Sequence, residues 1–143
     1  MKKRFLPGLL LIAIALVLLP HAAFSEPKAD EGGTGQMLSH NVFFKLKESD
    51  DASREVLINA CHKFLSGHPG VVFYAAGSLA GEFDRGVNVR DFDVALHLVF
   101  ADRAAHDAYQ EHPRHQQFVE ENRETWAEVR VFDSWVADAP KSE

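Results

Sequence analysis

Apolar and polar residues alternate along residues 39–47 and again along residues 128–136. A period of two predicts β-strands, because successive side chains of a strand point to opposite faces of its sheet. Two more strands are predicted at residues 71–79 and 91–100. The stretch 91–100 (DFDVALHLVF) is the most apolar one after the N-terminal segment, which is typical of a central strand covered on both faces.

A helix is predicted between the first two strands, with Asp51 as its capping residue. Its apolar residues follow an i, i+1, i+4, i+5 spacing that places them on one side of the helix. They are Val56, Leu57, Ala60, Cys61, Phe64 and Leu65. Gly67 is expected to end this helix, since glycine readily adopts the left-handed conformation found after helix C-termini. The charged, glycine-containing segment 80–90 is expected to be a loop.

Two further helices are predicted before the last strand. Asp102 is expected to cap a short helix over residues 103–110. Pro113 suits the first position of another helix running to about residue 126. The N–H of a first helical residue has no acceptor within the helix, so a proline, which lacks this N–H, loses no hydrogen bond there. The residues that recur at i, i+4 and i+8 along this helix are Phe118, Asn122 and Trp126.

In chain order the elements are strand, helix, strand, strand, helix pair and strand. This is the split βαβ arrangement of ferredoxin-like α+β folds, in which a four-stranded antiparallel sheet carries its helices on one face. The third strand is apolar on both faces, but no helix remains to cover the second face. A second copy of the chain is the simplest cover, so we predict a homodimer joined through its sheets, a dimeric α/β barrel.

The N-terminus has the three regions of a secretory signal peptide. A basic stretch at residues 2–4 precedes an apolar run at residues 5–19, and Ala23 and Ser25 are the small residues that a signal peptidase requires. The apolar run is shorter than the roughly 20 residues of a membrane-spanning helix. We therefore expect a signal peptide over residues 1–25, cleavage after Ser25 and a periplasmic or secreted protein. Membrane attachment through an uncleaved leader remains the alternative.

The rest of the chain is long enough for one domain. Residues 26–38 are polar and glycine-containing, and we expect a flexible linker there. The folded domain is predicted over residues 39–137, and residues 138–143 form a polar tail.

The charge and cysteine content narrow the choice of partners. The formal net charge is −6 and no basic stripe compensates it, so nucleic acid is not an expected partner. Cys61 is the single cysteine, which excludes a disulfide within one chain. Its apolar neighbours favour a small buried side chain over a reactive thiol, with a disulfide between two chains as the alternative.

Five segments resemble, in the same order, the stress-responsive dimeric α/β-barrel (Dabb) family. They are HNVFFKLK (40–47), PGV (69–71), FDVAL (92–96), FADRAA (100–105) and YQEHPRH (109–115). The resemblance extends from about Ser39 to Val136. It implies the same ferredoxin-like fold and the same kind of dimer.

The resemblance also implies a candidate site. The family contains an enzyme similar to a plant polyketide cyclase, in which a cofactor-free pocket between sheet and helices promotes an aldol-type ring closure. Its pocket groups fall here on His40, Tyr109 and His115. A histidine that the enzyme carries on its third strand is replaced by Val94, and His97, three residues on, is expected to point to the opposite face. Antibiotic-oxidising monooxygenases share the fold, which is an analogy at fold level only.

A His–Tyr pair suits proton abstraction next to a carbonyl group. Imidazole titrates near neutral pH, and a phenol can donate a hydrogen bond to a developing enolate oxygen. We assign His115 as the candidate base, Tyr109 as the donor and His40 as the group that orients the substrate. A packing role remains the alternative for all three.

A metal site is another use that histidines could have. His112 and His115 with Glu111 could offer ligands, but HPRH is not a spacing that zinc sites require. We therefore expect no metal and no cofactor. Three further histidines are expected to be exposed to solvent and to bind no metal: His62, His68 and His106.

Three functional hypotheses follow. The first is a protein that binds a small apolar or phenolic molecule in a pocket between sheet and helices. The second is a cofactor-free enzyme, polyketide-cyclase-like or monooxygenase-like, that uses the same residues for acid–base chemistry. The third is a non-catalytic structural dimer.

Overall fold

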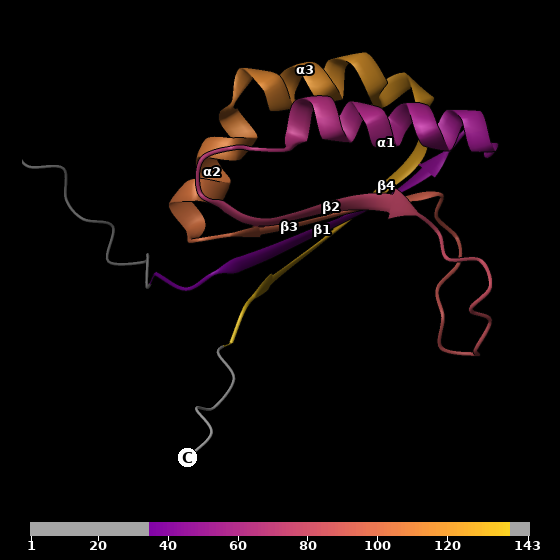
Figure 1. Ribbon diagram of the computed structural model, residues 1–143, viewed down its shortest axis with the longest axis horizontal. Coiled ribbons are helices and arrows are strands. Elements are labelled where there is room, and N and C mark those ends of the chain that lie inside the picture. Colours follow the sequence, from indigo (N-terminus) through magenta and orange to yellow (C-terminus); the bar gives the residue numbers. More distant parts are fainter. Residues whose placement is uncertain (1–34, 138–143) are drawn as a thin grey trace, which may run out of the picture.

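The computed structural model describes residues 35–137, which form one layer of helices on one sheet (Figure 1). The elements in chain order are β1 (Leu38–Leu46), α1 (Asp51–Leu65), β2 (Val71–Ser78), β3 (Val94–Phe100), α2 (Arg103–Glu111), α3 (Pro113–Asn122), a short 3-10 helix η1 (Arg123–Thr125) and β4 (Trp126–Trp135). The predicted signal peptide, most of the predicted linker and the tail lie outside the described residues. Within those residues, no helix has both the length and the apolar character needed to cross a membrane.

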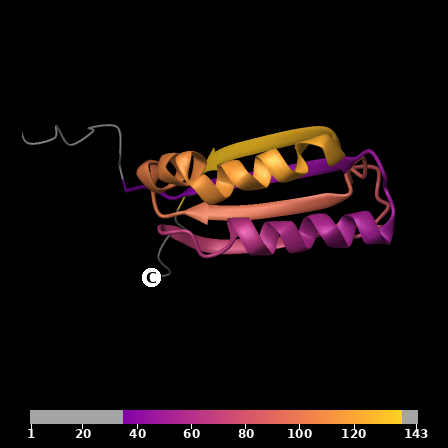
Figure 2. The ribbon, with the colours of Figure 1, turned by 90° about the horizontal axis from the view of Figure 1, so that it is seen from above.

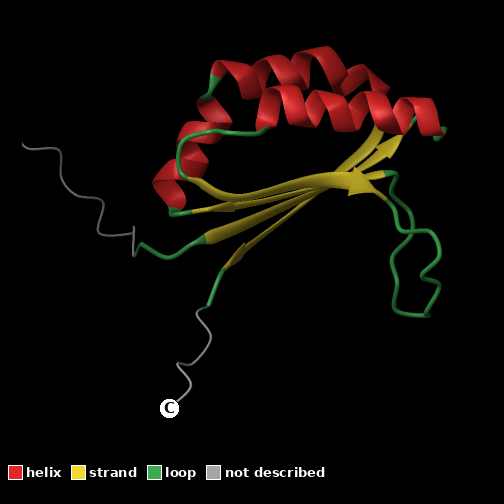
Figure 3. Ribbon diagram, in the orientation of Figure 1, coloured by secondary structure: helices red, strands yellow, loops and turns green. Residues whose placement is uncertain are grey.

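The four strands form one antiparallel sheet in the order β2-β3-β1-β4. The helices all lie on one face of it (Figure 3). Seen from above, α1 and α3 run side by side along the sheet, and α2 lies at one end (Figure 2). The predicted ferredoxin-like α+β fold is therefore confirmed.

Strand β1 shows the alternation that the sequence predicts. Every second side chain from Leu38 to Leu46 is buried beneath the helices, and the intervening ones are only partly buried on the open face. The buried strand residues join one core with the inner side of α1. Cys61 belongs to this core and is fully buried, and burial raises the pKa of its thiol to about 12, so the thiol stays protonated.

The open face of the sheet carries a small group of aromatic residues. Phe43 lies at its centre, with ring centroids 4.9 Å from Phe92 and 5.6 Å from Phe132. His97 also lies on this face, as predicted, and its Nδ1–H donates to Asn41 Oδ1 at 2.7 Å. Within residues 35–137, β3 is covered on one face only, because all the helices lie on that face of the sheet (Figure 1). The covering of both faces that the sequence predicts would need a second chain.

Several element boundaries differ from the sequence prediction. The capping residue of α1 is Asp50, not Asp51, and its side chain accepts from Ser53 N–H. Gly67 ends the helix as predicted, with a φ of +67°. Asp102 caps α2 as predicted, accepting from Ala105 N–H at 2.8 Å.

The last helix, predicted to run to about residue 126, is an α-helix only as far as Asn122, and the 3-10 helix η1 continues it to Thr125. Helix α3 ends at Asn122, whose side chain donates to Phe118 O at 2.8 Å, and Trp126 is the first residue of β4. From the strand, the Trp126 ring packs on Phe44 and Phe118, with centroids 5.2 and 5.7 Å away. The i, i+8 spacing of Phe118 and Trp126 therefore reflects a contact between them in the core, which Trp126 makes from a strand and not from a helix.

The predicted strand 91–100 begins only at Val94, because Asp93 has a different role. Its buried carboxylate accepts from Leu46 N–H at 2.8 Å and from Ser49 Oγ at 3.1 Å, and Lys45 Nζ lies 3.3 Å away. Burial alone would raise the pKa of this carboxyl, but these partners outweigh it, and the pKa lies below its ordinary value. Asp93 therefore ties the start of β3 to the end of β1 as a charged group.

Replacing Asp93 with alanine leaves the Leu46 N–H and the Ser49 hydroxyl without their acceptor. We expect Asp93→Ala to lower the free energy of unfolding by about 2–4 kcal/mol, measured by urea denaturation at pH 7. Because the folded-state pKa is lowered, the contribution is complete above the ordinary aspartate pKa and is lost as pH falls through the folded-state value. The difference between the two proteins should therefore shrink in acid.

The exposed loop residue Glu82 provides the matched control. Glu82→Ala should change stability by less than about 0.5 kcal/mol. Equal stability of Asp93→Ala and the unsubstituted protein would contradict the anchoring role of Asp93.

Candidate functional site

A cleft of about 300 Å³ lies between the sheet and the pair α2–α3. Its walls are mainly apolar, and its polar groups come from both layers. The apolar lining residues are Val42, Phe44, Leu65, Leu96, Val119, Trp126, Val129 and Val131, and the polar ones are His40, His106, Tyr109, Gln110, His115 and Asp133. All three residues predicted for the site, His40, Tyr109 and His115, are thus brought together here.

His40 is paired with a carboxylate from the neighbouring strand. The register of β1 and β4 places it directly opposite Asp133, and its Nδ1 lies 2.6 Å from Asp133 Oδ1. Since a carboxylate only accepts, Nδ1–H is the donor and the lone pair of a neutral ring is on Nε2. Burial lowers the pKa of His40, and the opposing effect of Asp133 does not restore it, which favours the neutral ring.

Tyr109 reaches the cleft from α2, and its ring lies near both histidines. Its ring centroid is 4.7 Å from that of His115 and 6.2 Å from that of His40, and only 2 % of the residue is exposed. Burial raises the pKa of its hydroxyl well above the ordinary value, so the group remains a hydrogen-bond donor at neutral pH.

His115 is positioned by the break between α2 and α3. His112 ends α2 and caps α3, where its Nδ1 accepts from Arg114 N–H at 3.1 Å. In the first turn of α3, His115 Nδ1–H donates to Gln110 O at 3.2 Å, which leaves its Nε2 as an acceptor. Burial lowers the pKa of His115 and favours the neutral ring.

The cleft therefore combines two neutral imidazoles with a protonated phenol. Each imidazole has its Nδ1–H held by an acceptor, and each has an Nε2 without a hydrogen-bond partner among the described residues. Such a set can accept protons from a bound molecule and donate a hydrogen bond to an oxygen of that molecule. The walls around it are apolar and would exclude water from a bound ring or chain.

Three polar residues of the cleft, Asp133, Gln110 and His106, were not identified from the sequence, and two histidines, His106 and His68, were predicted to be solvated but are not. In the structure the ring of His106 lies 5.3 Å from both His40 and Phe100. His68, also expected to be solvated, is buried and donates from Nε2–H to Phe64 O at 2.8 Å. His62 is exposed, as predicted.

Trp126 adds an unusual donor to the lining. Its indole Nε1 is buried and has no hydrogen-bond partner among residues 35–137. A buried donor without an acceptor costs about 1–3 kcal/mol.

Val94 is fully buried under the helices, so the position where the plant enzyme has a histidine is apolar here.

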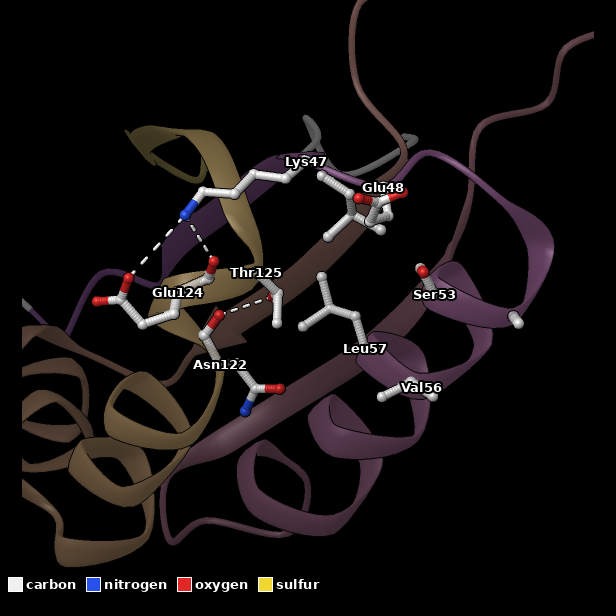
Figure 4. Close-up of a pocket in the computed structure, with 10 residues that line it drawn as sticks. Lys47, Glu48, Ser53, Val56, Leu57, Asn122, Glu124 and Thr125 are labelled. Carbon is white, nitrogen blue, oxygen red and sulfur yellow. Dashed lines mark hydrogen bonds and ion pairs between the residues drawn. The ribbon is translucent and has the colours of Figure 1, made fainter.

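A larger hollow, of about 470 Å³, lies at the opposite end of β1 (Figure 4). Four of its polar residues are paired with one another: Lys47 Nζ donates to Glu124 O at 2.7 Å, and Thr125 Oγ1 donates to Asn122 O at 2.7 Å. Its lining contains no histidine, tyrosine or cysteine side chain. The smaller cleft is therefore the better candidate site.

Comparisons with known proteins agree with this fold. A crystal structure of a Dabb family protein with a ferredoxin-like fold from Mesorhizobium loti is 24% identical, covers 72% of this chain and 99% of its own, and has a TM-score of 0.59. A dimeric ferredoxin-like protein of unknown function from Thermobifida fusca is 21% identical over 72% of this chain and 93% of its own, with a TM-score of 0.59. A hydroxynitrile lyase from Passiflora edulis is 16% identical over 73% of this chain and 97% of its own, also with a TM-score of 0.59.

These identities, all below 25%, show the fold alone. None of the curated proteins matches the chain. The profile of the family described as the stress responsive A/B barrel domain matches residues 38–136, which is most of the chain and nearly all of its described part. The protein therefore belongs to the stress-responsive A/B barrel (Dabb) family.

Proposed function

We propose that this protein binds a small, largely apolar molecule with a hydroxyl or carbonyl group in the cleft between the sheet and α2–α3. The observation that carries the proposal is the convergence of His40, Tyr109 and His115 within an apolar hollow. Ligand sites typically have this composition, with mainly apolar walls and a few polar groups that fix orientation. The volume of about 300 Å³ is at the lower end of the usual range and suits a single substituted ring.

The polar groups define the chemistry of that molecule. A phenol or enol can donate its hydroxyl proton to an imidazole Nε2, and a carbonyl oxygen can accept from the Tyr109 hydroxyl. None of these three side chains brings a full charge, because burial keeps both rings neutral and the phenol protonated. A neutral ligand therefore fits this part of the cleft better than a strongly charged one.

A cofactor-free enzyme is the second candidate. The pairing of His40 Nδ1 with Asp133 favours it, because a carboxylate that fixes the tautomer of an imidazole prepares the other nitrogen as a base. Proton abstraction next to a carbonyl would then use an imidazole as base and Tyr109 as the donor to the enolate oxygen. This chemistry includes cyclisation and isomerisation.

We further propose that the open face of the sheet is the interface of a homodimer. Similar structures from Thermobifida fusca and Bacteroides fragilis are described as dimeric. Phe132 on this face is 55 % exposed, and it lies beside Phe43, Phe92 and Val89 around a hollow of about 280 Å³. An apolar patch of this kind on a sheet face is stabilised when a second copy covers it.

Thermal shifts with a panel of alkylphenols and aryl ketones test the proposed ligand. A compound at 100 times its dissociation constant should stabilise the protein by about 2.7 kcal/mol. We expect Tyr109→Phe and His115→Asn each to weaken binding by roughly 5-fold, because each removes one hydrogen bond worth about 1 kcal/mol. Asparagine at position 115 keeps a donor near Gln110 O while removing Nε2.

His62→Asn is the control, since His62 is exposed on α1 and outside the cleft. It should bind as the unsubstituted protein does. If no compound stabilises the protein, or if the cleft variants bind as tightly as the control, the three side chains only pack. Product formation from a bound compound, detected by mass spectrometry and lost in His115→Asn, would favour the enzyme over the binding protein.

The dimer is tested by light scattering after size exclusion. We expect the unsubstituted protein to elute as a dimer and Phe132→Glu to elute as a monomer, because the new carboxylate would be buried without a partner in the interface. Val56→Glu is the matched control, since Val56 is 65 % exposed on α1, on the helical side. A monomeric unsubstituted protein, or a dimer that tolerates Phe132→Glu, would contradict the proposed interface.

A further inference from the structure

Three metal-ligating side chains meet at the edge of the cleft. They are His40 from β1, His106 from α2 and Asp133 from β4, and one ligand atom from each lies within 4.8 Å of those of the other two. The three residues are far apart in the sequence, so the fold alone brings them together. Two of them stand on paired strands and the third on a helix, which gives the group a rigid support.

The orientation of His106 resembles that of a metal-binding histidine. Its Nδ1–H donates to Asp107 Oδ1 at 3.2 Å, which fixes the tautomer with the lone pair on Nε2. That Nε2 accepts from the amide of Gln110 at 3.2 Å, a flexible side chain that can move aside. Histidine ligands of metals commonly donate their second ring N–H to a carboxylate in this manner.

We propose that His40, His106 and Asp133 form a binding site for a divalent first-row transition metal such as Zn²⁺. Two imidazole nitrogens and one carboxylate oxygen are ligands that Zn²⁺, Co²⁺ and Ni²⁺ accept, whereas Mg²⁺ and Ca²⁺ prefer oxygen ligands alone. The carboxylate supplies one negative charge, and the chain as a whole is acidic, with a formal net charge of −6. Both features favour a cation.

The spacing of the three groups is close to what a metal requires. Ligand atoms at about 2.1 Å from a tetrahedral zinc lie about 3.4 Å from one another. Zn²⁺ would take the place of the proton between His40 Nδ1 and Asp133 Oδ1, now 2.6 Å apart, so this pair would open slightly and the neutral ring would carry its proton on Nε2. The ligand atom of His106, which lies within 4.8 Å of the other two, would move closer. Asp133 is about half exposed and can rotate, so the adjustment needs side-chain movement only.

Three protein ligands leave at least one coordination position open. All three side chains line the cleft, so the open position faces the space in which we propose that a small molecule binds. The metal site does not rest on that proposal, because zinc can be held with water as its remaining ligand. It departs from the sequence-based expectation of no metal, which weighed His112, His115 and Glu111 as ligands and took His106 as solvated.

Isothermal titration of the full chain with ZnCl₂, after EDTA treatment and desalting, tests the site. We expect one zinc per chain, and Co²⁺ should give a visible absorption band that zinc removes. His106→Ala and Asp133→Asn should each weaken zinc binding by more than about 10-fold, which is the smallest effect expected even for residues that only support a ligand. Asp107→Asn should weaken it less than either of these.

His62→Ala is the matched control, because His62 is an exposed histidine outside the cluster. It should bind zinc with unchanged stoichiometry and affinity. Circular dichroism verifies that the variants are folded, and zinc should raise the melting temperature of the control but not of His106→Ala. Absence of zinc binding to the unsubstituted protein would overturn the proposal, as would binding that persists in both cluster variants or falls equally in His62→Ala.

Discussion

β1 lies between β3 and β4, and its alternating side chains separate the two faces of the sheet. Side chains at even positions from Leu38 to Leu46 are buried beneath the helices and form much of the core. Those at odd positions, among them Phe43, remain on the open face. A shift of one residue in its register would exchange the two sets, exposing the core and burying Lys45. The pairing of this strand with its neighbours therefore fixes which residues can form a site and which can form an interface.

The same register produces the site, because it places His40 on the covered face and opposite Asp133. A buried imidazole is stable only when its polar atoms are satisfied or its charge is suppressed. Asp133 satisfies one nitrogen, and burial suppresses the charge. The other nitrogen is left for a ligand or for water. The break at Pro113 brings His115 to the same place from the helical layer, next to Tyr109.

The fold could be predicted from the sequence because its signals are local. The alternation of β1, the apolar side of α1 and the cap at Asp102 each depend on a few neighbouring residues. Errors occurred where a distant contact decided the outcome. Asp93 ends its loop by bonding to Leu46, and Trp126 reaches the core from a strand although its spacing fits a helix.

The site was predicted only in part for the same reason. His40, Tyr109 and His115 came from a resemblance to a family, whereas His106 and Asp133 join them through pairing and packing that no local pattern shows. One signal was available for Asp133. Antiparallel alignment of the first and last predicted strands, end to end, places it within two positions of His40 and on the same face.

The central claim is that the cleft presents two neutral imidazoles with free Nε2 atoms beside a phenol donor. Long-range ¹H–¹⁵N spectra of the histidine side chains, recorded on metal-free protein at pH 7, test it most directly. The account predicts that His40 and His115 are neutral and carry their proton on Nδ1. Doubly protonated rings, or protons on Nε2, would contradict it, because the nitrogens that face the cleft would then be unable to accept a hydrogen bond.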